Sequence, residues 1–334
     1  MQNKKNKTIL VTGGAGYVGS ILVPKLLDAG YSVNVLDLYI FGKESLRTIR
    51  NNPELKEFAG DIRNPETIRK AVKGCSTVIH LACISNDPSF ELNPLLGKSI
   101  NYDAFTELLN ISIDSGVKRF IYASSSSVYG LKEEENVTEE LPLKPLTDYS
   151  KYKALCEEIL LKKNSPSFTT LILRPATICG YSPRQRLDLI VNILTNHAFN
   201  NRKIQVFGGE QKRPNIHIQD MTDLYIKCIE YPKKLIDSQV FNAGYENFTV
   251  HQTANIIQEI VGKDVSINTV PTDDNRSYHI SSRKIYNQLN FKPKFGIKNA
   301  AFDLLSAFSN NLIPNPMMNK NYYNIKVMQS INLK

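Results

Sequence analysis

The sequence predicts an α/β fold, in which a doubly wound parallel sheet carries a smaller α+β lobe. Short β-branched runs alternate with helical patterns in the first half of the 334 residues, a glycine-rich turn follows the first run, and prolines and glycines interrupt the second half. Apolar strands separated by helices are typical of a parallel sheet with both faces covered. We therefore expect a sheet domain over residues 1–175, a second lobe mainly over 176–312, and a tail over 313–334.

The first half supplies the expected sheet and its helices. Each expected strand is a short run of β-branched, aromatic or leucine residues, and the helices carry apolar residues at helical spacing, as Ile21, Leu22 and Leu26 do. The expected strands are Thr8–Thr12, Ser32–Leu36, Thr77–Leu81, Arg119–Ala123 and Thr170–Leu173. The expected helices are Ser20–Ala29, Pro65–Val72, Asn101–Ser115 and Ser150–Lys162.

The second half is interrupted too often by proline and glycine to continue the same alternation. Helices are expected at Leu187–Phe199, Thr222–Tyr231, Val250–Val261 and Ile297–Ser309. The tail after Leu312 is rich in asparagine and contains two prolines, so we expect it to be loosely ordered.

Composition and charge argue against several classes of protein. The net charge is +9, but the basic residues are interspersed, which disfavours a nucleic-acid partner. No apolar stretch approaches the roughly 18–20 residues that cross a bilayer. The apolar residues after Met1–Lys7 reach Gly13 too soon for a secretory signal, so we expect a cytoplasmic protein. The 5 cysteines form no CxxC pair and the 5 histidines are dispersed, so neither disulfides nor a metal site is expected.

A glycine-rich turn indicates a dinucleotide site. The first expected strand runs into glycines at 13, 16 and 19 and then into a helix. Such glycines allow a tight turn and close approach of a diphosphate, and the helix N-terminus attracts its charge. Asp37 ends the next expected strand, where a carboxylate binds a ribose 2′-hydroxyl and repels a 2′-phosphate. The pattern predicts NAD rather than NADP.

A tyrosine, a lysine and a serine indicate hydride chemistry at an alcohol. Tyr149 and Lys153 stand one helical turn apart, after a strand that ends in the hydroxyl cluster Ser124–Ser127. A phenol, whose ordinary pKa is about 10, becomes a usable base when a nearby ammonium stabilises the phenolate. Ser125 would orient the same substrate oxygen. Alone, either feature is better explained by a surface pair or a serine-rich loop; together with the glycine turn, they favour the catalytic interpretation.

The glycine turn, Asp37, the serine cluster and the Tyr149/Lys153 pair follow one another in this order along the chain. In this the sequence resembles the extended short-chain dehydrogenase/reductase superfamily, and within it the nucleotide-sugar epimerases and dehydratases. The resemblance implies a Rossmann-type NAD-binding domain, a substrate lobe, and a homodimer that pairs Asn101–Ser115 with Tyr149–Lys162. The apolar stripe of Phe105, Leu108 and Leu109 could equally face its own sheet. The implied cofactor residues are Gly13, Gly16, Tyr17, Val18, Asp37, Asp61, Ile62, Leu81, Ala82, Cys83, Asn101, Tyr149, Lys153 and Pro175.

The resemblance also extends to the substrate, a nucleoside-diphosphate sugar. Arg213 and Arg276 resemble the family's diphosphate-binding arginines, and Arg186 is a third expected anion contact. Before context, each arginine is about as often a plain surface charge. Ser85, Asn86, Ser126 and Thr177 are the other expected substrate contacts.

The serine cluster narrows the expected reaction. The family's dehydratases carry Thr-Asp-Glu where this chain has Ser125, Ser126 and Ser127, and a second branch places a cysteine acid/base at the position of Ser127. The sequence therefore predicts NAD-dependent epimerisation at C4 of the sugar. A net 4-dehydrogenase or 4-keto reductase is the alternative, and a non-catalytic NAD-sensing or RNA-binding protein is a third hypothesis, disfavoured by the intact Ser125, Tyr149 and Lys153.

Overall fold

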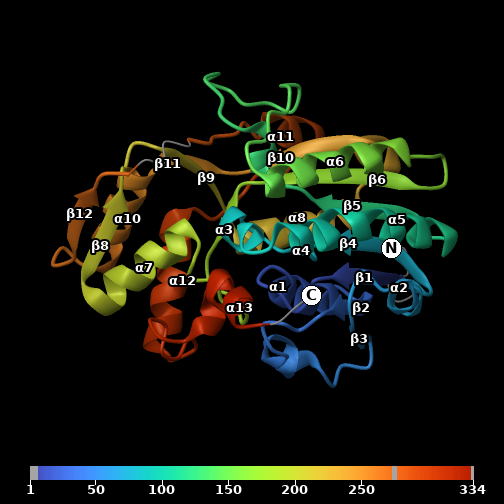
Figure 1. The fold of residues 1–334 in the computed structure, drawn as a ribbon, viewed down its shortest axis with the longest axis horizontal. Coiled ribbons are helices and arrows are strands. Elements are labelled where there is room, and N and C mark those ends of the chain that lie inside the picture. Colours follow the sequence, from blue (N-terminus) through green and yellow to red (C-terminus); the bar gives the residue numbers. More distant parts are fainter. Residues whose placement is uncertain (1–6, 273–276, 332–334) are drawn as a thin grey trace.

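The chain is built on a single seven-stranded parallel sheet (Figure 1). The computed structural model describes residues 7–272 and 277–331. In the described residues the strand order is β10-β6-β5-β4-β1-β2-β3, and every neighbouring pair is parallel. The strands are β1 (Thr8–Thr12), β2 (Ser32–Asp37), β3 (Leu55–Ala59), β4 (Cys75–His80), β5 (Arg119–Ala123), β6 (Thr169–Pro175) and β10 (Gln239–Ala243).

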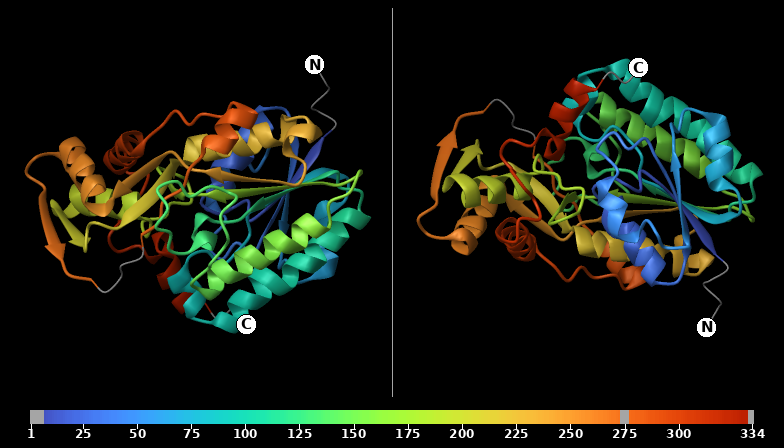
Figure 2. Two further views of the ribbon diagram at one scale, coloured as in Figure 1. Left: turned by 90° about the horizontal axis from the view of Figure 1, so that it is seen from above. Right: turned by 90° about the horizontal axis from the view of Figure 1, so that it is seen from below.

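Helices cover both faces of this sheet, as Figure 2 shows with the sheet seen on edge. One face packs on α1 (Gly19–Asp28), α8 (Ile218–Glu230) and α11 (Arg283–Leu289). The other face packs on α2 (Pro65–Val72), α5 (Ala104–Asp114) and α6 (Asp148–Lys162). The short helices α3 (Asp87–Glu91), α4 (Pro94–Lys98) and α9 (Lys233–Ile236) complete these layers. The doubly wound fold class is thus confirmed.

The predicted elements are present, with ends shifted by a few residues. β1, α2, β5, α10 and α12 have the expected bounds. Two sheet strands, β3 and β10, were not predicted. β10 lies beyond the boundary expected at residue 175, yet it pairs with β6 and completes the sheet. β10 therefore belongs to the main sheet although it follows residues of the smaller lobe in the sequence. It was not predicted because an edge strand of five residues, flanked by proline and glycine, has too short a hydrophobic pattern.

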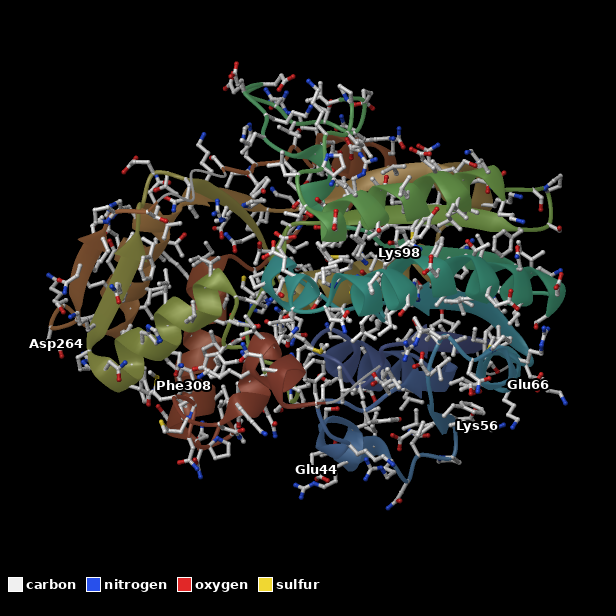
Figure 3. The ribbon with its side chains drawn as sticks, viewed as in Figure 1. Glu44, Lys56, Glu66, Lys98, Asp264 and Phe308 are labelled. Atoms are coloured by element: carbon white, nitrogen blue, oxygen red, sulfur yellow. The ribbon has the colours of Figure 1, made fainter. Side chains whose placement is uncertain are left out.

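The smaller lobe lies at one end of the sheet layer (Figure 1). It contains a three-stranded sheet, β11-β9-β7, and a two-stranded sheet, β12-β8. Its strands are β7 (Thr177–Cys179), β8 (Lys203–Phe207), β9 (Lys212–His217), β11 (Glu246–Thr249) and β12 (Ser266–Val270). Its helices α7 (Ile190–Asn201), α10 (Val250–Val261) and α12 (Ile297–Ser309) enclose a separate apolar core. Asp264 marks the outer tip of this lobe in Figure 3, far from the strand ends of the main sheet.

The C-terminal segment is packed onto the body, so the expectation of a loosely ordered tail was wrong. Ile313, Tyr323 and Val327 are buried, and the segment ends in helix α13 (Asn324–Ser330). The reason is that a few apolar side chains, spaced by four residues at Tyr323 and Val327, find a partner surface on the body despite the polar composition. Within the described ranges, no helix is long and apolar enough to cross a membrane.

Candidate active site

The glycine turn after β1 is a tight backbone feature. Gly13 adopts φ +73°, and a Cβ atom there would lie 2.7 Å from the amide nitrogen of Ala82. A Cβ on Gly19 would lie 2.4 Å from the carbonyl oxygen of Gly14. The turn thus needs glycine for two reasons, a left-handed backbone at one position and close packing of α1 on the turn at the other.

Asp37 stands at the end of β2, beside this turn. Its carboxylate accepts hydrogen bonds from the backbone amides of Ala15, at 2.9 Å, and Tyr39, at 2.7 Å. Burial raises the pKa of Asp37, and the two amide bonds oppose that effect because they favour the charged form. The carboxylate is therefore fixed in orientation, with further lone pairs available to accept hydroxyl groups.

Tyr149 and Lys153 project from the first turns of α6. Thr147 caps this helix in a capping box with Ser150, which fixes where the helix begins. Lys153 is buried, donates a hydrogen bond to the carbonyl oxygen of Ala123 at 2.7 Å, and holds its ammonium 5.9 Å from the Tyr149 ring centroid. The end of β5 therefore positions Lys153 beside the tyrosine.

The protein by itself disfavours the tyrosinate. Burial raises the pKa of Tyr149 well above its ordinary value, and electrostatic interactions with Cys83 and Asp87 raise it further. Arg186 and the hydroxyl of Ser125 act in the opposite direction. The sequence predicts that Lys153 lowers this pKa, and that role stays a prediction. In the structure the groups that lower it are Arg186 and Ser125, and burial outweighs both.

The serine cluster after β5 is braced by a buried ion pair. Ser125 and Ser127 share a hydrogen bond of 2.8 Å between their hydroxyl oxygens. Ser124 donates to Glu157 of α6, and Glu157 in turn pairs with Arg174 of β6 at 2.6 Å. This network joins the ends of two strands to the helix that carries Tyr149, so it fixes the serines relative to the tyrosine.

A cavity of about 440 Å³ lies over the ends of β1, β2, β4 and β5 and brings most of the predicted residues together. The predicted residues that line it are Gly13, Gly16, Tyr17, Val18, Asp37, Ile62, Leu81, Ala82, Cys83, Ser85, Asn86, Ser125, Ser126, Tyr149, Lys153, Pro175, Thr177, Arg186 and Arg213. Such a cavity, with polar groups converging on it, is typical of a small-molecule site.

Two predicted residues, Asn101 and Asp61, are described but do not line this cavity. Asn101 uses its side-chain amide to hold the backbone of Ile84, with contacts of 2.8 and 2.9 Å. Asp61 is paired with Arg63 at 2.6 Å, although its neighbour Ile62 reaches the cavity. Arg276 lies outside the described residues. Asn101 therefore shapes the loop after β4, and direct cofactor contacts by Asn101 and Asp61 remain predictions.

Two of the predicted anion contacts are held by neighbours. Arg186 is paired with Asp188 at 2.9 Å and donates to the hydroxyl of Ser85 at 3.2 Å. Arg213, on β9, lies with its guanidinium 5.6 Å from the ring centroid of Tyr278. Both arginines belong to the smaller lobe and face the strand ends of the main sheet across the cavity.

The sequence missed further cavity residues. Asp87 accepts a hydrogen bond from Thr147 at 2.7 Å and lies close enough to raise the pKa of Tyr149. Arg184 lies two residues before Arg186, in the same segment from which the sequence predicted an anion contact, so the sequence could have indicated it. Phe41 and Asn324 carry no local signal, because an aromatic after β2 and an asparagine in an asparagine-rich tail are unremarkable in sequence.

A comparison with protein families decides what this site belongs to. The model of the NAD dependent epimerase/dehydratase family matches residues 9–244. The chain belongs to this family. The resemblance to extended short-chain dehydrogenases/reductases is thus confirmed, and the protein is an NAD-dependent enzyme of that type.

Individual members of the family agree with this membership over nearly the whole chain. A UDP-glucose 4-epimerase of Lactobacillus helveticus is 28% identical over 313 residues, which cover 86% of this chain and 92% of the relative. The crystal structure of UDP-glucose 4-epimerase with UDP-glucose from Thermotoga maritima matches with a TM-score of 0.81 and 27% identity, covering 91% and 99% of the two chains. The dTDP-glucose 4,6-dehydratase from Streptomyces venezuelae, with NAD and TYD bound, shares the fold, with a TM-score of 0.83, 21% identity and coverage of 93% and 99%.

The residues of this family member fit NAD. Gly16, Tyr17 and Val18 leave the start of α1 open to the cavity, where unpaired amides and the helix dipole favour a diphosphate. Asp37 offers a fixed carboxylate to ribose hydroxyls. Tyr149 and Lys153 lie in the same cavity. The prediction of NAD as cofactor is confirmed.

Proposed function

We propose that the enzyme epimerises C4 of a nucleoside-diphosphate sugar through a transient 4-keto sugar. The observation that carries the proposal is the shared cavity. Tyr149, Lys153 and Ser125 lie on its sheet side, and Arg186 and Arg213 lie on the side formed by the smaller lobe. A sugar alcohol can meet the first group while its diphosphate meets guanidinium groups, which suit such anions. That its relatives include a UDP-glucose 4-epimerase supports the same reading.

Each residue has a role that follows from its position. Tyr149 takes the proton of the C4 hydroxyl, since its phenol lines the cavity beside Lys153 and can exchange a proton. Ser125 orients the same oxygen, and Lys153 holds positive charge beside the ring. Bound NAD supplies the hydride acceptor and a positive charge that favours the tyrosinate. Tyr149 then returns the proton when hydride is delivered to the opposite face of C4, so the overall reaction has no net redox change.

The distribution of carboxylates in the site supports epimerisation over dehydration. Elimination of water needs an additional acid and base close to the reacting carbons. Ser125, Ser126 and Ser127 provide none at the end of β5. Of the described residues that line the cavity, the carboxylates are Asp37, which accepts from the backbone amides of Ala15 and Tyr39, and Asp87, which accepts from the hydroxyl of Thr147. This distribution favours hydride chemistry at one carbinol carbon.

The test is proton NMR of UDP-, GDP-, CDP- and dTDP-sugars incubated with the protein and substoichiometric NAD. A new anomeric signal at the position of the C4 epimer, growing beyond one equivalent of cofactor, is the expected result. NADH that accumulates in proportion to substrate would instead establish a net 4-dehydrogenase. Loss of water, detected by mass spectrometry, would establish a dehydratase, and bound NAD with no turnover on any sugar would favour a non-catalytic role.

A homodimer is part of the proposal and rests on the resemblance. The helices expected at the dimer axis, α5 and α6, lie side by side on one face of the sheet (Figure 1). The stripe of Phe105, Leu108 and Leu109 does not serve that axis, because all three are fully buried against their own sheet. Sedimentation velocity measures the oligomeric state directly, and a monomer at micromolar concentration would refute this part.

A further inference from the structure

Arg184 lines the cavity and is buried without an anionic partner. Only 6% of the residue is exposed, yet no carboxylate in the described parts of the chain lies within ion-pair distance of it. Its Nε is buried and has no hydrogen-bond partner in the described structure. Its Nη2 donates to the amide oxygen of Asn324 at 2.5 Å, which is a neutral group. The carboxylates of Asp188 and Asp37 act on this guanidinium only from beyond contact distance. Arg184 is therefore a buried charge that no carboxylate contacts.

Arg186, which lines the same cavity, has a guanidinium that is paired with a carboxylate. Arg186 is paired with Asp188 at 2.9 Å through Nε, the same atom that has no partner in Arg184. Burial and the charge of Arg186 lower the pKa of Arg184 to about 9, although Asp188 and Asp37 act in the opposite direction. This is the effect expected when a cation is desolvated beside another cation. An anion entering the cavity would relieve both effects.

The surroundings of Arg184 indicate which end of the cavity that anion occupies. The backbone amide of Arg184 contacts the hydroxyl of Ser20 at 3.3 Å, and Ser182 donates to the carbonyl oxygen of Tyr17 at 2.7 Å. The segment that carries Arg184 is therefore fastened to the start of α1. Its guanidinium lies 3.6 Å from the ring centroid of Phe41, a few residues after Asp37. These contacts belong to the dinucleotide end of the cavity.

We propose that Arg184 binds a phosphate group of the bound dinucleotide, with Phe41 and Asn324 holding its guanidinium in place. The start of α1 offers amides from one side, and Arg184 offers a planar donor from the smaller lobe. The cofactor is thereby enclosed between two lobes and held on the second by the C-terminal segment. This inference concerns the cofactor, so it does not depend on which sugar reaction the enzyme performs.

Calorimetric titration of the purified enzyme with NAD, ADP-ribose, adenosine and UDP tests the proposal. We expect Arg184→Gln to weaken NAD and ADP-ribose binding about tenfold or more, since hydrogen bonds to charged groups contribute on that scale. Adenosine, which has no phosphate, should bind the variant and the parent equally. Equal weakening of adenosine and ADP-ribose would show that Arg184 acts on the nucleoside, and weakening of UDP alone would place it at the sugar nucleotide; either result overturns the proposal, as does an unchanged affinity for ADP-ribose.

Two further variants control for charge and folding. Asp264 lies at the tip of the smaller lobe (Figure 3) and pairs with Arg202. Arg202→Gln removes one positive charge there and should leave ADP-ribose binding unchanged. Asn324→Asp keeps the size of the side chain that meets Arg184 but supplies an internal carboxylate. It should weaken ADP-ribose binding while adenosine binding persists, because the carboxylate competes with the phosphate. Retained ADP-ribose affinity in a folded Asn324→Asp protein would count against the proposal.

Discussion

The two sides of the cavity are built in different ways. The sheet side consists of strand ends and the turns that follow them, so Gly13, Asp37 and Ser125 each lie where one strand of the sheet stops. The opposite side consists of segments far apart in the chain. Arg184 and Arg186 come from the loop after β7, Arg213 from β9, and Asn324 from the tail.

This difference separates backbone geometry from side-chain contacts. On the sheet side, the order and direction of the parallel strands are sufficient to place these residues at one edge of the sheet. On the other side, each residue is positioned by a specific partner: Asn324 by Arg184 and Ser85, for example. Mutations should therefore affect the sheet side through chemistry and backbone strain, and the opposite side through packing.

Tyr149→Phe should produce the largest effect, on the sheet side. The substitution keeps the ring and removes the proton-transfer group, so turnover should fall by about 10²–10⁴-fold. NAD affinity should change little, because the ring and Lys153 remain in place. Steady-state kinetics and calorimetry measure the two quantities. Turnover close to that of the parent would remove Tyr149 from the chemistry and make the two sides of the cavity alike.

Tyr323→Ala should destabilise the opposite side. Tyr323 is buried under the C-terminal segment and donates to the carbonyl oxygen of Pro316 at 2.9 Å. Removing a buried aromatic ring should lower the free energy of unfolding by about 3 kcal/mol, as measured by urea denaturation. Met318→Ala in the same segment is the matched control, since Met318 is 84% exposed and its loss should be nearly silent. Equal effects of the two would mean that the tail does not pack as described.

His80 should make the stability of the sheet side depend on pH. It is buried in β4, bonds Thr12 at 2.7 Å, and burial lowers its pKa to about 3 from an ordinary value of 6.5. Between these pH values the imidazole binds a proton in the unfolded chain but not in the folded chain. The contribution of neutral His80 to the free energy of unfolding is therefore complete above pH 6.5 and is lost on acidification. The loss should reach about 1.4 kcal/mol per pH unit. In denaturation curves taken from pH 6.5 to 4.5, His80→Asn should flatten this slope; a slope unchanged by the substitution would assign it to other groups.

The substitutions Gly13→Ala and Gly74→Ala should differ in the free energy of unfolding by the smallest amount of these predictions. Their comparison tests the glycine turn directly. Both glycines have similar backbones, at φ +73° and +76°, so both substitutions carry the same strain of more than about 1 kcal/mol. A Cβ at Gly13 meets Ala82 at 2.7 Å, whereas at Gly74 nothing lies within 4 Å. Gly13→Ala should therefore be the less stable of the two and should also weaken NAD binding. Identical unfolding free energies and NAD affinities would show that the turn tolerates a side chain.

The sequence by itself determined the sheet, the cofactor turn and the acid/base group. The alternation of strands with helices is a local pattern, and the glycine turn, Tyr149 and Lys153 are fixed by neighbours within a few residues. Their relative positions then follow from the parallel sheet, which explains why β1, β5 and α2 appeared with the expected bounds.

Only the tertiary structure decided the edge strand, the tail and the second wall of the cavity. β10 becomes a strand because β6 offers it an unpaired edge, and the tail is ordered because Tyr323 and Val327 find an apolar surface. Asn101 holds the backbone of Ile84, and Asn324 contacts Arg184 across 140 residues. The physical reason is that these positions are stabilised by contacts with residues far away in the sequence. Such a partner decides the conformation, and the hydrophobic periodicity of the neighbouring residues does not indicate it.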